Sequence, residues 1–221
     1  MSIYKVYLYS FLSLAFSYPS KELLEELRGG LEDLSLSLKN MGIEFDLEAL
    51  EKVIKEGKER ILDLQGEWNA LFSTNLKAPA NETAYELDKA VRKAWELADI
   101  EGFYRAFGVD VRPPVEPDGI VAELEFMSCL LVKRMHLEKE NLEEGIEVVD
   151  KAYKSFLRDH LGRWYRIFTD LVKESTEEEY YRVMASLLRA FLDTQRDGLE
   201  IKDIEEYRRE ALEGISWKCG I

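Results

Sequence analysis

Apolar side chains recur along most of the chain at intervals of three and four residues, the spacing of one face of an α-helix. In residues 1–19 the apolar positions 8, 11, 12, 15 and 16 follow this period. Polar residues interrupt the stretch and no basic segment precedes it, so we expect a core-facing helix and not a secretion signal. No segment alternates with the period of two that is typical of a strand. The pattern predicts an all-α fold, a multi-helix globular domain.

Capping residues and glycines indicate where the helices begin and end. After the first helix, the expected helical segments are 20–27, 31–41, roughly 47–72, 87–107, 118–140, 141–161, 164–172 and a last one from 176 onward. Ser20 and Asp46 are expected to cap their helices, and Asp118 lies where another cap belongs. Two capping boxes are expected, at Asn141–Glu144 and Thr176–Glu179.

One segment cannot continue any helix. Residues 109–117, Val-Asp-Val-Arg-Pro-Pro-Val-Glu-Pro, contain three prolines, which remove backbone donors and force extended geometry. This proline-rich loop is expected to separate the two helical halves of one domain, residues 1–197. Gly162 is expected to bend or break the helix that precedes it. Residues 198–221 are charged and sparsely apolar, and we expect a tail that is partly helical or frayed.

The charge balance narrows the class of partner. The 221 residues include 44 acids and 30 bases, which gives a formal charge of −14. Such a surface repels phosphate backbones, so no nucleic acid is expected, and it attracts cationic peptides, although acids also simply keep helical faces solvated. No stretch approaches about 18 apolar residues, so no membrane span is expected. Two cysteines do not make a disulfide framework, which favours a reducing, cytoplasmic location.

The sequence shows no pattern of catalytic or cofactor-binding residues. It has no glycine-rich phosphate loop and no dinucleotide fingerprint. Cys129, Cys219, His136 and His160 have no standard spacing for zinc, so neither a metal nor another cofactor is expected. Asp159 beside His160 is the one adjacent acid–imidazole pair, and a local hydrogen bond explains it more simply than catalysis. The chain is therefore expected to be a binding protein and not an enzyme.

Four short motifs occur in order along the chain. They are Trp68-x-x-Leu71-Phe72, the segment Ala78-Pro-Ala-Asn-Glu-Thr-Ala-Tyr85, then Pro117-Asp118-Gly119-x-x-x-Glu123-Leu124-x-Phe126-Met127, and Phe156-x-x-x-His160-Leu161-x-x-Trp164. Together they resemble the TorD/DmsD/NarJ family of redox-enzyme maturation chaperones, over roughly residues 5–195. One departure is Gly119, because the family commonly has there a histidine that is implicated in leader binding in some members.

The resemblance implies a fold of the TorD/DmsD type and a cytoplasmic chaperone for a molybdopterin-containing redox enzyme, such as a DMSO, TMAO or nitrate reductase. Such a chaperone binds the twin-arginine signal peptide, or N-terminal region, of the catalytic subunit until cofactor loading is complete. A leader presents arginines and then an apolar helical segment, so carboxylates beside an apolar groove are expected. The leader-binding residues that the motifs suggest are Trp68, Leu71, Phe72, Tyr85, Pro117, Asp118 and Glu123.

Several of these residues also have a plainer interpretation. Trp68, Leu71 and Phe72 share one helical face, which can form an apolar wall or ordinary core. Asp118 can bind a leader arginine or only cap a helix. Glu123, further along the same helix, can extend an acidic rim or simply be solvated.

Two other functions stay open from the sequence. A helical scaffold could use the same aromatic faces for self-association, with residues 111–117 as the hinge of a domain-swapped homodimer, so the chain could be a monomer or a homodimer. A protein that handles nucleotides or the molybdenum cofactor is the other alternative. The lack of a phosphate loop counts against this second function.

Overall fold

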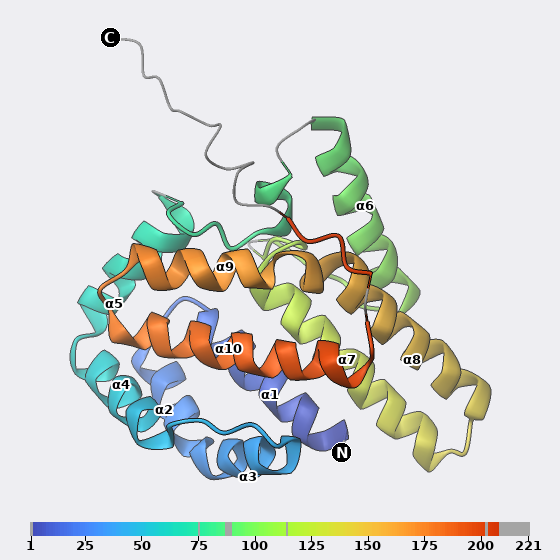
Figure 1. Ribbon diagram of the computed structural model, residues 1–221, viewed down its shortest axis with the longest axis horizontal. Coiled ribbons are helices and arrows are strands. Elements are labelled where there is room, and N and C mark those ends of the chain that lie inside the picture. The colour runs from blue at the N-terminus through green and yellow to red at the C-terminus, as the bar shows by residue number, and fades with distance from the viewer. Residues whose placement is uncertain (1, 75, 87–89, 114, 202, 208–221) are drawn as a thin grey trace.

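The computed structural model describes residues 2–74, 76–86, 90–113, 115–201 and 203–207 (Figure 1). Within these ranges the chain is largely helical and forms no strand, and an isolated antiparallel bridge joins Asn81 to Gly119. The all-α fold predicted from the sequence is therefore confirmed. No helix in the described ranges is both long enough and apolar enough to cross a membrane.

Most of the helices follow one another with short connections, and longer segments precede and follow α6. In chain order the α-helices are α1 (Ser2–Phe16), α2 (Lys21–Gly29), α3 (Leu31–Met41), α4 (Leu47–Glu59), α5 (Ile61–Trp68), α6 (Ala90–Ala106), α7 (Ile120–Lys139), α8 (Glu143–Phe156), α9 (Gly162–Ser175) and α10 (Glu179–Gly198). The π-helical turns η1 (Asn69–Ser73) and η3 (Leu157–Leu161) and the 3-10 helix η2 (Glu82–Tyr85) lie between them. Because π-turns are frequent at functional sites, η1 and η3 indicate the region of the fold in which a functional site is expected.

The first helix lies at the centre of the domain. α1 packs along α7 and also contacts α2, α3 and α10 (Figure 1). The five apolar side chains that the sequence pattern placed on its core face are all buried, at most 3% exposed. On another face of α1, Tyr9 lies edge-on against Phe191, with ring centroids 4.7 Å apart. A helix with neighbours on several faces buries more than one stripe of side chains, as α1 does.

The prediction of a single long helix over residues 47–72 is wrong. α4 and α5 are separated at Arg60, whose backbone leaves the helical region (φ −111°, ψ 40°). After this break the chain continues in a new direction, and Trp68 Nε1 donates to Phe16 O at the end of α1 (2.9 Å). A contact with a distant helix thus accompanies the break, and such tertiary contacts override local helix propensity.

Two predicted helix caps are confirmed. Ser20 Oγ accepts a hydrogen bond from Leu23 N (3.1 Å) at the start of α2. Asp46 Oδ1 accepts one from Ala49 N (3.0 Å) at the start of α4. Each side chain satisfies a backbone N–H that the first turn of its helix leaves without a partner.

The other predicted caps are wrong. Asp118 does not cap α7, which starts after Gly119 without a side-chain cap, because the carboxylate of Asp118 binds a different segment. Asn141 has a left-handed backbone (φ 55°) after α7, so it cannot also take the extended shape of a cap for α8. Thr176 Oγ1 accepts from Glu178 N (3.0 Å) before α10 begins. Neither capping box forms.

The described residues of the proline-rich loop are not helical, as predicted. Those of the predicted tail have no helix beyond Gly198 either, and they pack on the domain. Tyr207 N donates to Arg163 O (2.9 Å), and Ile201 is 7% exposed. Residues 208–221 lie outside the described part of the chain, and the division into a domain of residues 1–197 and a tail stays a prediction.

The bend predicted at Gly162 lies where η3 meets α9. A Cβ atom on Gly162 would lie 2.0 Å from Leu157 O, the backbone carbonyl at the start of η3, which is far inside van der Waals contact. Because this neighbour is backbone, it cannot rotate away. The wide turn therefore requires glycine, and it places His160 and Trp164 in the core with no exposed surface.

We predict that Gly162→Ala lowers the free energy of unfolding by at least about 1–3 kcal/mol, the usual cost of overpacking a close contact. Urea denaturation measures the change. Gly66→Ala is the matched control, because a Cβ built on Gly66 in α5 meets no atom within 4 Å outside the adjoining residues and backbone of its own helix. There alanine should raise the stability by roughly 0.5–1 kcal/mol, since glycine is a poor helix former. Similar effects of the two substitutions would contradict a requirement for glycine at η3.

Candidate functional site

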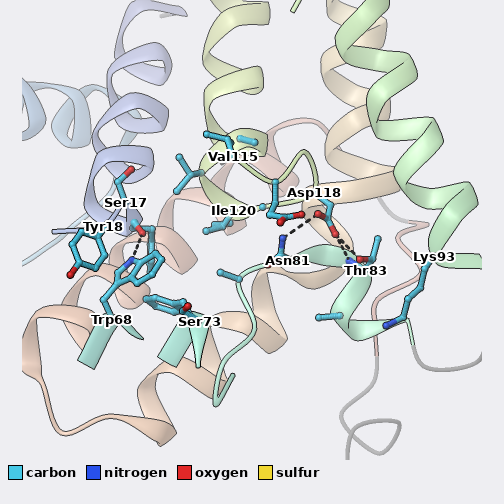
Figure 2. A pocket seen from close by; sticks show the side chains of 18 residues that line it. Ser17, Tyr18, Trp68, Ser73, Asn81, Thr83, Lys93, Val115, Asp118 and Ile120 are labelled. Carbon is cyan, nitrogen blue, oxygen red and sulfur yellow. Dashed lines mark hydrogen bonds between the residues drawn. The ribbon is translucent and has the colours of Figure 1, made fainter. Parts of the chain in front are cut away.

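An open pocket of about 730 Å³ lies between the end of α1, the end of α5 with η1, the segment around η2, and the first turn of α7 (Figure 2). Ligand pockets in proteins commonly have volumes of roughly 300–1,000 Å³. Figure 2 shows Tyr18 and Trp68 on one side of this pocket, and Asn81, Thr83 and Asp118 toward the other. The pocket therefore has an aromatic side and a polar side.

Trp68 and its neighbours form the aromatic side. The indole N–H of Trp68 donates to Phe16 O (2.9 Å), which fixes the ring beside the end of α1. The ring packs edge-on against Tyr18, with centroids 5.2 Å apart, and against Phe72, at 5.8 Å. Phe72 is buried, whereas Tyr18 is 49% exposed and Trp68 is half-buried. An aromatic surface that is held in place and open to solvent can receive an apolar side chain of a ligand.

Asp118 joins two segments on the polar side. Its carboxylate accepts hydrogen bonds from Asn81 Nδ2 (3.1 Å), Thr83 N (3.1 Å) and Thr83 Oγ1 (2.6 Å), and the residue is 3% exposed. The backbones of the two segments are also paired, because Glu82 N donates to Asp118 O (2.8 Å). Asp118 therefore holds residues 81–83 against the start of α7.

The residues that the sequence motifs suggested fall into two groups. Those that line the pocket are Trp68, Phe72 and Asp118, and those that do not are Leu71, Tyr85, Pro117 and Glu123. Leu71 and Tyr85 are buried in the core and Pro117 is half-buried. Glu123 is completely buried, so it lies neither at an acidic rim nor in solvent. The structure thus brings three of the seven residues together at one open surface.

A buried polar cluster adjoins the pocket at η2, and its centre is Glu82. Glu82 Oε2 lies 3.1 Å from His160 Nδ1, and His160 Nε2 lies 3.2 Å from a carboxylate oxygen of Asp99. Arg163 Nη1 lies 2.9 Å from Glu96 Oε1 and 3.6 Å from Glu82 Oε1. Because Glu82 and His160 have no exposed surface, these contacts replace the hydration that both side chains lose.

Glu123 on α7 extends the cluster into the core. Its Oε2 accepts a hydrogen bond from Trp164 Nε1 (3.0 Å). Burial raises the pKa of Glu123 well above its ordinary value, and the nearby carboxylate of Glu82 raises it further. The protonated acid is therefore favoured. Its second oxygen, Oε1, is buried and has no hydrogen-bond partner among the described residues.

The pKa values of Glu82 and His160 are raised as well. Burial raises the pKa of Glu82, and the hydrogen bond and charge of His160 oppose this only in part. Burial lowers the pKa of His160, but the hydrogen bond and charge of Glu82, together with Asp99 and Glu96, outweigh it. The surrounding acids therefore favour charged His160, which can act as a counter-ion to Glu82.

Glu82, Glu96 and His160 also offer the donor types of a divalent-cation site, because one ligand atom of each lies within 4.8 Å of the others. Arg163 already places a positive charge beside both carboxylates, so an ion-pair network explains the cluster. The sequence motifs contain Glu82 and His160 but give no sign that these residues meet. η3 lies far beyond η2 and α6 along the chain, so no local spacing brings His160 together with Glu82 and Glu96.

The structure shows an all-helical protein with an open pocket, and comparison with known proteins gives its family. Residues 39–170 match the family model described as nitrate reductase delta subunit. The match covers more than half of the chain, so the chain belongs to this family. The family predicted from the sequence motifs is thereby confirmed.

Two known proteins are similar to this chain. The chain is 28% identical over 136 residues to the perchlorate reductase assembly chaperone protein of Dechloromonas aromatica (strain RCB), and the match covers 59% of each protein. The chain therefore aligns with less than two thirds of that relative's length. It is 23% identical to a proposed redox enzyme maturation protein from Archaeoglobus fulgidus of known crystal structure, with a TM-score of 0.48 over 89% of this chain and 93% of that one.

We predict that Glu123→Gln changes the stability little near pH 5 and stabilises the protein increasingly, relative to the wild type, toward alkaline pH. Glutamine keeps an oxygen that can accept from Trp164, but it does not titrate. Because the pKa of Glu123 is raised in the fold, the folded wild type binds more protons than the unfolded chain, and its stability falls as the pH rises from the ordinary to the raised pKa. Urea denaturation between about pH 5 and 9 measures the difference.

Glu123→Leu separates the titration from the hydrogen bond. It removes the same acid but also leaves the buried Trp164 N–H without its acceptor, which costs about 1–3 kcal/mol at every pH. Glu82 and His160 titrate in the wild type and in both variants. Because their pKa values are also raised, they too lower the stability of each protein as the pH rises. A difference between wild type and Glu123→Gln that did not vary with pH would contradict a protonated Glu123.

Proposed function

We propose that this protein is an assembly chaperone for a molybdopterin-containing redox enzyme, and that its pocket binds the twin-arginine leader or N-terminal region of the catalytic subunit. Membership of the nitrate reductase delta subunit family supports the chaperone role, as does the similarity to a perchlorate reductase assembly chaperone protein. The observation that carries the proposal is an open pocket with an aromatic side and two carboxylates. In this proposal the protein is a non-catalytic binding protein that acts in the cytoplasm, before the catalytic subunit is exported.

The chemistry of a twin-arginine leader matches both sides of the pocket. Guanidinium groups bind carboxylates through paired, charge-assisted hydrogen bonds, and Glu116 and Asp118 are the acids among the described residues that line the pocket. Tyr18, Trp68 and Phe72 offer aromatic surface to the apolar segment that follows the arginines. The formal charge of −14 adds a long-range attraction for a cationic peptide.

The predicted site residues that do not line the pocket have a supporting role in this proposal. Leu71 is completely buried on η1, next to Phe72 in the sequence. Tyr85 OH donates to Pro79 O (2.7 Å), which ties η2 to the preceding loop. Pro117 O accepts from Tyr104 OH (2.6 Å), which ties the segment before α7 to α6. These contacts hold the walls of the pocket.

Isothermal titration calorimetry of the full chain tests the proposal. The ligand is a synthetic peptide with two adjacent arginines followed by an apolar helical segment, and we expect micromolar affinity. Trp68→Ala should weaken binding at least about tenfold, because an aromatic anchor in a pocket often contributes about 2 kcal/mol or more.

Trp95→Ala is the matched control for Trp68→Ala. Trp95 on α6 is 75% exposed and lies outside the pocket, so its loss should leave the affinity unchanged. Both variants are titrated at a temperature at which melting curves show them folded. No binding of twin-arginine peptides at millimolar concentration would refute the proposed function. Equal losses in the two variants would show that the peptide binds elsewhere.

A further inference from the structure

We infer that Glu116 is the carboxylate that pairs with an arginine of the bound leader, and that Asp118 is a positioning residue. The inference rests on the proposed function, because it identifies the arginine partner within the same pocket. Among the described residues that line the pocket, Glu116 and Asp118 carry negative charge and Lys93 carries positive charge. These side chains differ in how free they are to meet a ligand.

Asp118 is fully engaged within the protein. It is 3% exposed, its Oδ1 accepts from Asn81 Nδ2 (3.1 Å), and its Oδ2 accepts from Thr83 N (3.1 Å) and Thr83 Oγ1 (2.6 Å). A guanidinium that forms two parallel hydrogen bonds needs both oxygens of a carboxylate on their accessible side. Because Asp118 is buried and its Oδ2 already accepts two hydrogen bonds, such pairing would displace Thr83 and loosen the wall of the pocket. Asp118 therefore affects ligand binding indirectly, because it holds residues 81–83 of the pocket wall in place.

Glu116 has the opposite properties. Its side chain is exposed at the pocket, and it forms no hydrogen bond or ion pair with the residues that the structure describes. Its backbone is nevertheless held, because Gly119 N donates to Glu116 O (3.0 Å) and the adjoining Pro117 O accepts from Tyr104 OH (2.6 Å). A free carboxylate on a held turn can meet a guanidinium without first breaking a bond within the protein.

Lys93 restricts where the arginine can lie. Figure 2 shows Lys93 beyond Thr83, on the side of the pocket away from Tyr18 and Trp68. A guanidinium close to Lys93 is repelled, whereas one at Glu116 is attracted. The arginine therefore binds at Glu116, and the apolar segment that follows it extends toward Trp68.

A double-mutant cycle tests the pairing of Glu116 with arginine. The full chain and its Glu116→Gln variant are each titrated with two synthetic peptides, one with two adjacent arginines before an apolar segment and one with glutamines in their place. We expect Glu116→Gln to weaken binding of the arginine peptide by about fivefold, as for a partly exposed ion pair, and to leave the glutamine peptide unaffected. The loss should shrink at high salt, since screening weakens the pair in the wild type.

Two further variants serve as controls. Glu44→Gln makes the same change of charge at an exposed site outside the pocket, and it should leave both affinities unchanged. Asp118→Asn should weaken both peptides by similar factors and lower the melting temperature, because the bonds to Thr83 are disturbed. If Asp118→Asn does not fold, the comparison of Glu116→Gln with Glu44→Gln still decides the question.

The possible results separate the inference from the proposed function. If the wild type prefers the arginine peptide and Glu116→Gln keeps that preference, the inference is overturned and the proposed function stands. Equal losses of both peptides in Glu116→Gln would also overturn it, because Glu116 would then shape the pocket without pairing. If the wild type binds neither peptide, the proposed function fails and the inference fails with it.

Discussion

The carboxylate of Asp118 accepts three hydrogen bonds from Asn81 and Thr83, and these bonds hold residues 81–83 against the first turn of α7. This segment is short, irregular and polar, so apolar burial alone does not fix it. Hydrogen bonds to a charged acceptor are stronger than neutral ones, about 1.5–3 kcal/mol each. On its other side the segment is held through Glu82, which bonds to His160. Polar contacts on both sides thus set the position of one pocket wall, whereas most of the core around α1 is apolar.

The cluster around Glu82 determines geometry more than it adds stability. Burying a charged group costs several kcal/mol, and a partner of opposite charge offsets much of this. Arg163 and His160 are those partners for Glu82, and Glu123 avoids the cost because it favours its protonated form. An arrangement of η2, α6 and η3 that separated Glu82 from Arg163 and His160 would leave its buried charge unpaired. The glycine at position 162 allows the wide turn of η3 that brings His160 into this cluster.

Local patterns were sufficient where neighbouring residues decide the structure. The apolar period located α1 and its buried face, and Ser20 and Asp46 cap the helices that they precede. The break at Arg60 was not predicted, because the residues around it continue the helical period and no glycine or proline marks it. Asp118 was expected to cap α7, but its hydrogen-bond partners precede it by more than thirty residues, at 81 and 83. Glu116 belongs to none of the motifs, and it stands out by its exposure and by the lack of a side-chain partner among the residues that the structure describes.

The glycine at position 119 fits this separation of roles. A Cβ atom there would lie 3.1 Å from Glu116 O, so a larger side chain would press on the turn that carries Glu116. Gly119 also forms the bridge to Asn81 that brings the two segments together. The resembling family commonly places an imidazole at this position, whereas the buried imidazole of this chain, His160, lies in the cluster around Glu82. Gly119 adds no positive charge at this position, and in the proposed complex the leader arginine meets Glu116, whose carboxylate has no partner among the described residues.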